Sequence, residues 1–153
     1  MTDLDRSMLR ALAEWSPQVP VTSLYLAVDG RQRPRRSDYL TRLDELLRDA
    51  RTQVNGMAAD AARSVEGDLG RMSAHVREGF DRAGTRGLAL FSASAAGLWE
   101  EVRLWRPVRD RAFVAPRAEV RMLEALLETY GATCTVLVDF EKARLFLLHL
   151  GRI

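Results

Sequence analysis

Apolar positions at the start of the chain recur at helical spacing and then give way to one continuous apolar run. The helical stripe consists of Leu4, Met8, Leu12 and Trp15. Thr2 and Asp5 have the spacing of a capping box, which predicts that this helix begins at the first residues. Residues 21–28 are rich in β-formers and apolar on both faces, which predicts a buried central strand.

Two longer helical stripes follow a polar loop, and Ser37 is a suitable N-cap for the first of them. Their apolar positions are Leu40, Leu43, Leu46, Leu47 and Ala50, and then Ala62, Val65, Leu69, Met72, Val76 and Phe80. Asn55-Gly56 interrupts the pattern, so residues 52–58 are expected to join two antiparallel helices.

After residue 87 the period changes to two, which predicts strands. The segments with this pattern are residues 88–92, 98–105 and 112–115. One more helix is expected from about Arg117 to Tyr130, with Gly131 as its C-terminal cap.

The last two apolar segments, residues 133–139 and 143–150, are expected to form a hairpin because only three residues separate them. The second segment is apolar on both faces and should be covered on both sides, yet the chain ends at Ile153. We therefore expect either that the natural continuation is missing or that another chain covers the hairpin.

The order of these elements predicts an α/β fold in which a mixed sheet packs against helices, including a long helix pair. Residues 1–131 are expected to form one α/β domain. Residues 132–153 are expected to be a β-hairpin belonging to an incomplete second domain.

The composition is that of an ordinary soluble protein, with 47% hydrophobic and 29% charged residues and no apolar run long enough to span a membrane. The acidic, polar start lacks the features of a secretory signal, so a cytoplasmic location is expected. The single cysteine, Cys134, is expected to be buried, and with His75 and His149 it cannot assemble a metal site. No metal or cofactor is predicted.

All but one of the 23 lysines and arginines are arginine, while the formal net charge is only +2. Contact with nucleic acid would therefore have to come from local clusters. One cluster is the loop with Arg31, Arg33, Arg35 and Arg36, whose mutual repulsion an RNA backbone would relieve. Another is Arg103, Trp105 and Arg106, followed by Arg109 and Arg111, which could stack on and clamp single-stranded RNA. Solvated polar surface is the alternative for both.

The usual signatures of an active site are missing from the sequence. Ser92 and Ser94 lie near a turn without the Gly-x-Ser-x-Gly elbow of hydrolases. Glu100 and Glu101 are adjacent on a predicted strand, so their side chains point to opposite faces. No catalytic residue is predicted.

Several stretches resemble the bacterial archaeo-eukaryotic release factor family. They are Thr-Ser-Leu-Tyr-Leu-Ala-Val-Asp at residues 22–29, Arg-Gly-Leu-Ala-Leu-Phe-Ser at 86–92, Trp-Glu-Glu-Val-Arg-Leu at 99–104, and residues 136–146 with 150–153. The resemblance implies the N-terminal domain of a peptide-chain release factor-like protein, followed by the first hairpin of an RNase-H-like middle domain. It implies the ribosome or tRNA as partner. It also makes the turn between the long helices a candidate for RNA binding, with Arg48, Arg51, Gln53 and Asn55.

The chain departs from this family at two motifs. The Gly-Gly-Gln loop that carries ester hydrolysis in the family's middle domain does not occur, so this chain is expected to be no enzyme. The Asn-Ile-Lys-Ser motif of the eukaryotic factors is absent from residues 52–56, so ribosome rescue fits better than stop-codon reading. The competing hypothesis is a homo-oligomeric or adaptor protein that pairs its exposed C-terminal hairpin with a partner and does not bind RNA.

Overall fold

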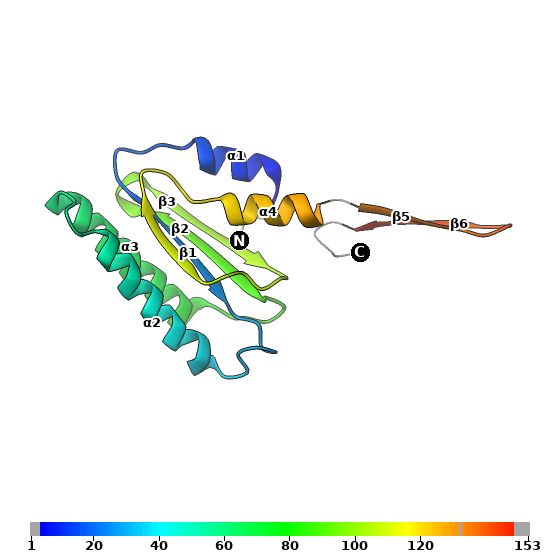
Figure 1. The fold of residues 1–153 in the computed structure, drawn as a ribbon, viewed down its shortest axis with the longest axis horizontal. Coiled ribbons are helices and arrows are strands. Elements are labelled where there is room, and N and C mark those ends of the chain that lie inside the picture. Colours follow the sequence, from blue (N-terminus) through cyan, green and yellow to red (C-terminus); the bar gives the residue numbers. More distant parts are fainter. Residues whose placement is uncertain (1–3, 132, 149–153) are drawn as a thin grey trace.

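A four-stranded sheet lies between two layers of helices (Figure 1). The computed structural model describes residues 4–131 and 133–148. In their order across the sheet, the strands are β3 (Leu98–Leu104), β2 (Gly87–Ala93), β1 (Val21–Ala27) and β4 (Arg111–Ala115). Strand β1 is interior and all of its residues are buried, which confirms the predicted central strand.

The predicted α/β class, with a sheet packed against helices and a long helix pair, is confirmed. Every neighbouring pair of strands in this sheet is antiparallel, so its strand directions are not mixed. The connection between β1 and β2 explains this arrangement. A single crossover helix would make the next strand parallel, whereas two antiparallel helices return the chain to the end at which β1 finished.

Helices α2 (Arg36–Gln53) and α3 (Ala59–Ala74) cover one face of the sheet, and α1 (Arg6–Glu14) and α4 (Arg121–Tyr130) cover the other (Figure 1). The side chains of β1 alternate between the two layers. Leu24 and Leu26 pack against the helix pair, while Val21 and Tyr25 pack on the side of α1 and α4. Burial of each such leucine stabilises the fold by about 2 kcal/mol.

Asp5 caps α1, because its carboxylate accepts a hydrogen bond of 2.7 Å from the Met8 N–H. Thr2, the other half of the predicted capping box, lies outside the described residues. The expectation that Ser37 caps α2 is wrong, since the helix begins at Arg36 with Arg35 as its N-cap residue. The Asp38 carboxylate accepts from the Arg35 N–H at 2.9 Å and thereby fixes the start two residues earlier.

Helix α4 begins at Arg121, four residues after the predicted start at Arg117. The backbone of Glu119 is tied to β1 instead: its N–H donates to the Ser23 hydroxyl at 3.0 Å, and its carbonyl accepts from the Tyr25 hydroxyl. These bonds satisfy the Glu119 peptide groups outside a helix. Helix α3 is followed directly by a π-helical turn, His75–Gly79, which carries the predicted apolar stripe on towards Phe80.

Strands β5 (Thr133–Val138) and β6 (Ala143–Leu148) form the predicted hairpin, which projects beyond α4 and away from the sheet (Figure 1). Cys134, expected to be buried, is exposed there. In register, Val136 pairs with Leu145 and Cys134 with Leu147, so one face of the ribbon is apolar. The side chains of Val138, Leu145 and Leu147 are 73%, 70% and 65% exposed, so this face is uncovered. That the hairpin opens a second domain beginning at residue 132 stays a prediction.

Candidate nucleic-acid interface

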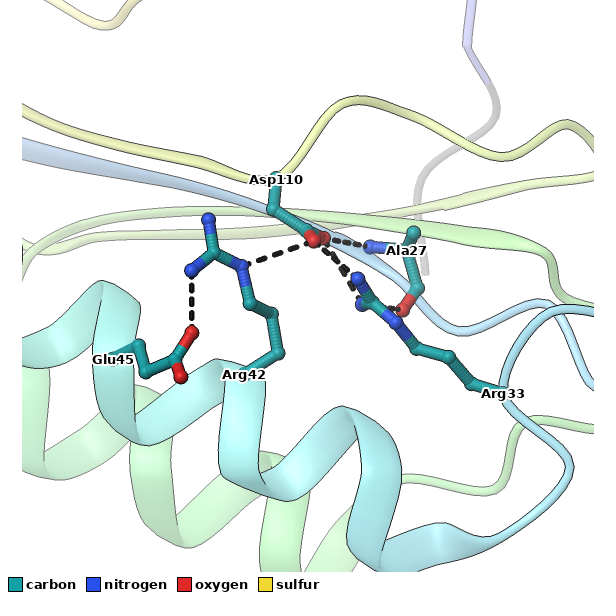
Figure 2. Close-up of polar contacts among 5 residues, drawn as sticks. All are labelled: Ala27, Arg33, Arg42, Glu45 and Asp110. Carbon is teal, nitrogen blue, oxygen red and sulfur yellow. Dashed lines mark hydrogen bonds and ion pairs between the residues drawn. The ribbon is translucent and has the colours of Figure 1, made fainter.

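Asp110 organises the loop that leads from β1 to α2 (Figure 2). The strand pairing between β1 and β4 ends at Tyr25 and Arg111, which leaves the Ala27 N–H without a ladder partner. The Asp110 carboxylate accepts that N–H at 2.7 Å. It also accepts from both terminal nitrogens of Arg33 and, at 3.2 Å, from Arg42 Nε.

Arg33 is therefore an anchor of the loop. Besides the carboxylate, its guanidinium donates to the Ala27 carbonyl at 2.6 Å, and its side chain is 22% exposed. Burial raises the pKa of Asp110, but hydrogen bonds from Arg33 and the Ala27 N–H lower it by more, so the pKa lies below its ordinary value. The carboxylate stays charged at neutral pH and holds Arg33 away from solvent.

The other arginines of the loop differ in whether their guanidiniums form hydrogen bonds within the chain. Arg36 donates to the Arg77 carbonyl. Arg31 and Arg35 are exposed, and their guanidiniums make no hydrogen bond or ion pair with any described residue. Of the four arginines in this loop, only Arg31 and Arg35 keep all their guanidinium donors for a partner.

Arg31 lies at the edge of a groove of about 690 Å³ that we call the arginine groove. Its lining consists of residues 29–31, residues 82–86 and Trp105. The structure thus brings together Arg31 of the loop cluster and Trp105 of the second predicted cluster, which we call the strand-end cluster and which consists of Arg103, Trp105 and Arg106. Arg82 and Arg86, which the sequence analysis passed over, complete the lining. Their position on either side of a Gly84 turn was the signal that could have found them.

The rest of the strand-end cluster is partly engaged. Arg103 bonds to the Glu101 carboxylate and donates to the Asp81 carbonyl at 3.1 Å. Arg106 lies over two aromatic rings, 4.9 Å from the centre of Trp105 and 4.1 Å from the centre of Tyr130. Trp105 and Tyr130 meet edge to face at 5.5 Å. Arg103 is thereby a structural residue, while Trp105 and Arg106 belong to an aromatic surface beside the groove.

The residues at the turn between α2 and α3 are further from the groove, because the 18 residues of α2 span about 27 Å. Arg51 forms a two-pronged pair with Glu66, at 2.8 and 2.9 Å, and lowers the pKa of that carboxyl. The Gln53 amide bridges the Ala112 carbonyl and the Val114 N–H, at 2.8 and 2.9 Å. It therefore covers an edge strand.

Arg48 and Asn55 are exposed, and Arg48 makes no ion pair with any residue in the described part of the chain. The eleven predicted residues consequently do not form one surface. Arg31, Trp105 and Arg106 lie at one end of the sheet, and Arg48 and Asn55 lie towards the other.

Two polar clusters, one buried and one half-buried, were not predicted, although the sequence analysis named several of their residues. Asp68 is fully buried, and its Oδ1 accepts from the Ser92 hydroxyl at 2.7 Å and from the Ser94 N–H at 2.8 Å. His75 Nε2 lies 2.7 Å from Glu101 Oε2. Both clusters join α3, or the turn that follows it, to the sheet. No group of acidic, histidine or cysteine side chains among the described residues could hold a metal ion.

The domain has a release-factor-like fold. It is similar to the crystal structure of an archaeal translation termination factor, aRF1, with a TM-score of 0.57 and 22% identity over 93% of this chain and 39% of that one. A second solved structure, described as an archaeal protein, gives a TM-score of 0.53 and 20% identity over 93% of this chain and 40% of that one. The chain thus spans about two fifths of the length of these structures.

No protein-family model matches the chain, and neither does any curated protein. No helix among the residues that the structure describes is long and apolar enough to cross a membrane.

Proposed function

We propose that this chain is a translation-related module that binds the ribosome or tRNA through exposed arginines and has no catalytic centre of its own. The observation that carries the proposal is its likeness in fold to an archaeal translation termination factor over 93% of the chain. The unpaired guanidiniums of Arg31, Arg35 and Arg48 are suited to RNA phosphates, because planar guanidinium donors match phosphate oxygens.

The module would bind and orient, while hydrolysis would belong to a middle domain carried elsewhere in a parent protein. The absence of a Gly-Gly-Gln sequence supports this division of labour. The absence of an Asn-Ile-Lys-Ser motif at residues 52–56 favours ribosome rescue over stop-codon reading. The proposed setting is the bacterial cytoplasm.

Co-sedimentation with bacterial ribosomes across a salt series tests this function. The chain is expected to pellet with ribosomes at low salt and to be released as salt rises, because phosphate contacts are screened. A triple variant, Arg31→Ser with Arg35→Ser and Arg48→Ser, should remain in the supernatant at salt concentrations where the unsubstituted chain pellets. Arg33 is left intact in this variant because it holds the loop through Asp110.

The matched control removes the same number of charges from exposed arginines outside the candidate interface, by Arg6→Ser, Arg10→Ser and Arg117→Ser. It should pellet nearly as well as the unsubstituted chain. If both triple variants lose pelleting equally, binding follows bulk charge and the proposed interface is wrong. If the unsubstituted chain fails to pellet even at low salt, direct ribosome binding is wrong.

The uncovered hairpin favours a second candidate function, a homodimer in which the apolar faces of two hairpins stack. Sedimentation equilibrium should then show a dimer that dissociates on dilution. Leu145→Glu is expected to give a monomer, because a carboxylate would be buried against apolar side chains. Thr135→Glu adds the same charge to the opposite face of the ribbon and should still dimerise. A monomer at every concentration would contradict this candidate.

A further inference from the structure

The arginine groove presents more positive than negative charge. Arg31, Arg82 and Arg86 line it together with a single carboxylate, that of Asp29. Asp29 is 6% exposed, and its ion pair with a guanidinium of the groove is a long one, 3.9 Å from Oδ2 to Arg86 Nε. Its Oδ1 accepts from the Arg31 N–H at 3.0 Å. The carboxylate therefore shapes the loop more than it neutralises the guanidiniums.

The Arg82 side chain and the Arg86 backbone are held in place before any ligand arrives. Arg82 donates to the carbonyls of Arg33 and Pro34, each at 2.7 Å, and makes no ion pair with a described residue. The peptide groups of Arg86 join two strands: its carbonyl accepts from the Val28 N–H at 2.9 Å, and its N–H donates to the Leu104 carbonyl at 2.7 Å. Little ordering cost therefore remains for Arg82, whereas the side chains of Arg31 and Arg86 become ordered when they meet a phosphate.

An aromatic surface borders the same groove. Trp105 contributes to the lining, and Arg106 and Tyr130 brace it from outside the groove. An indole beside clustered guanidiniums is a combination by which proteins bind single-stranded nucleic acids, since the bases stack on the ring and the phosphates meet the cations. In a duplex the bases already stack on one another and cannot reach the indole.

We propose that the arginine groove binds a nucleotide unit of single-stranded RNA, with its phosphates on Arg31 and Arg86 and a base stacked on Trp105. This inference rests on the proposed function and specifies single-stranded RNA as the form that this end of the sheet binds. Arg82 supports the site by fixing the loop through the Arg33 and Pro34 carbonyls. The volume of about 690 Å³ lies within the range of small-ligand sites.

Fluorescence anisotropy with a short labelled polyuridine oligonucleotide tests the site on the full chain. Arg31→Gln with Arg86→Gln should weaken binding by about tenfold and reduce the slope of log K against log salt by about 1.4, or about 0.7 for each lost phosphate contact. Trp105→Leu should also weaken binding by about tenfold, with the salt slope unchanged, because stacking is not ionic. Arg10→Gln with Arg117→Gln removes equal charge elsewhere and should bind as the unsubstituted chain does.

Each variant must first show the thermal unfolding curve of the unsubstituted chain, so that a folding defect is not scored as lost binding. The site is wrong if the Arg31 and Arg86 variant binds as well as its control, or if duplex RNA of equal length binds as tightly as the single strand. It is also wrong if an acidic peptide displaces the oligonucleotide at equal concentration. Ribosome pelleting without oligonucleotide binding would overturn the groove proposal and leave the proposed function standing.

Discussion

Asp110→Asn is expected to lower the free energy of unfolding by about 3 kcal/mol at neutral pH, the lower end of what breaking a buried ion pair costs. The substitution keeps the size of the side chain but removes the charge that holds Arg33 and Arg42 (Figure 2). The amide nitrogen must also face a cation or the Ala27 N–H, neither of which can accept a hydrogen bond. Urea unfolding followed by circular dichroism measures the loss.

The loss of stability in the Asp110→Asn variant is expected to depend on pH. The pKa of Asp110 is lowered in the folded chain, so the unfolded chain binds this proton more readily. The stabilising contribution is complete above the unfolded pKa of about 3.9 and is lost as pH falls through the lower folded pKa. The difference in unfolding free energy between the two proteins should therefore be constant near neutral pH and shrink below about pH 4.

Asp49→Asn is the matched control, because Asp49 is exposed and its carboxylate makes no hydrogen bond or ion pair with any described residue. It should change stability by less than about 0.5 kcal/mol. An Asp110→Asn protein as stable as this control would mean that Arg33 keeps its place without the ion pair. Arg33 would then be as free to meet RNA as Arg31.

The elements of the fold were predictable because each follows from the local spacing of its apolar residues. The stripes with Leu43 and Leu47, and with Val65 and Leu69, gave the helix pair, and these four side chains are buried. A predicted helix boundary was wrong where residues distant in sequence fix the conformation of the backbone. Ser23 and Tyr25 hold Glu119 from more than 90 positions away, which no local pattern around the start of α4 records.

The candidate site was less predictable for the same reason. Four arginines in one loop look equivalent in sequence, yet Asp110, 77 positions from Arg33, removes that arginine from the surface. The arginine groove combines three segments that meet only after the sheet has formed. Local sequence contained Arg31 and Trp105 but gave no sign that they share a groove with Arg82 and Arg86.

Gly87 lies at the end of the sheet beside the arginine groove, where the backbone is closely packed. It begins β2 and pairs with Ala27 on one side and Leu104 on the other. A Cβ at this position would lie 2.5 Å from the Arg106 carbonyl oxygen and 3.2 Å from the methyl groups of Val108. A glycine is thus required here because a backbone carbonyl, which cannot rotate away as a side chain can, occupies the space.

Gly87→Ala is therefore expected to destabilise the fold by about 2 kcal/mol, the usual cost of forcing extra volume into a packed site. Gly67→Ala is the control with the opposite sign: Gly67 lies on the exposed side of α3 with nothing within 4 Å of the added Cβ. That substitution should stabilise the chain by about 0.5–1 kcal/mol through helix propensity. Thermal and urea unfolding of both variants measure the contrast.

The carbonyl that Gly87 accommodates belongs to Arg106, which stacks on Trp105. Displacement of this segment should also shift Trp105, so Gly87→Ala should weaken oligonucleotide binding even under conditions where the variant is fully folded. If the variant is as stable as the unsubstituted chain, residues 106–108 yield without cost and the aromatic surface is not rigidly placed. A stable variant with unchanged RNA binding would show that Trp105 does not depend on this contact.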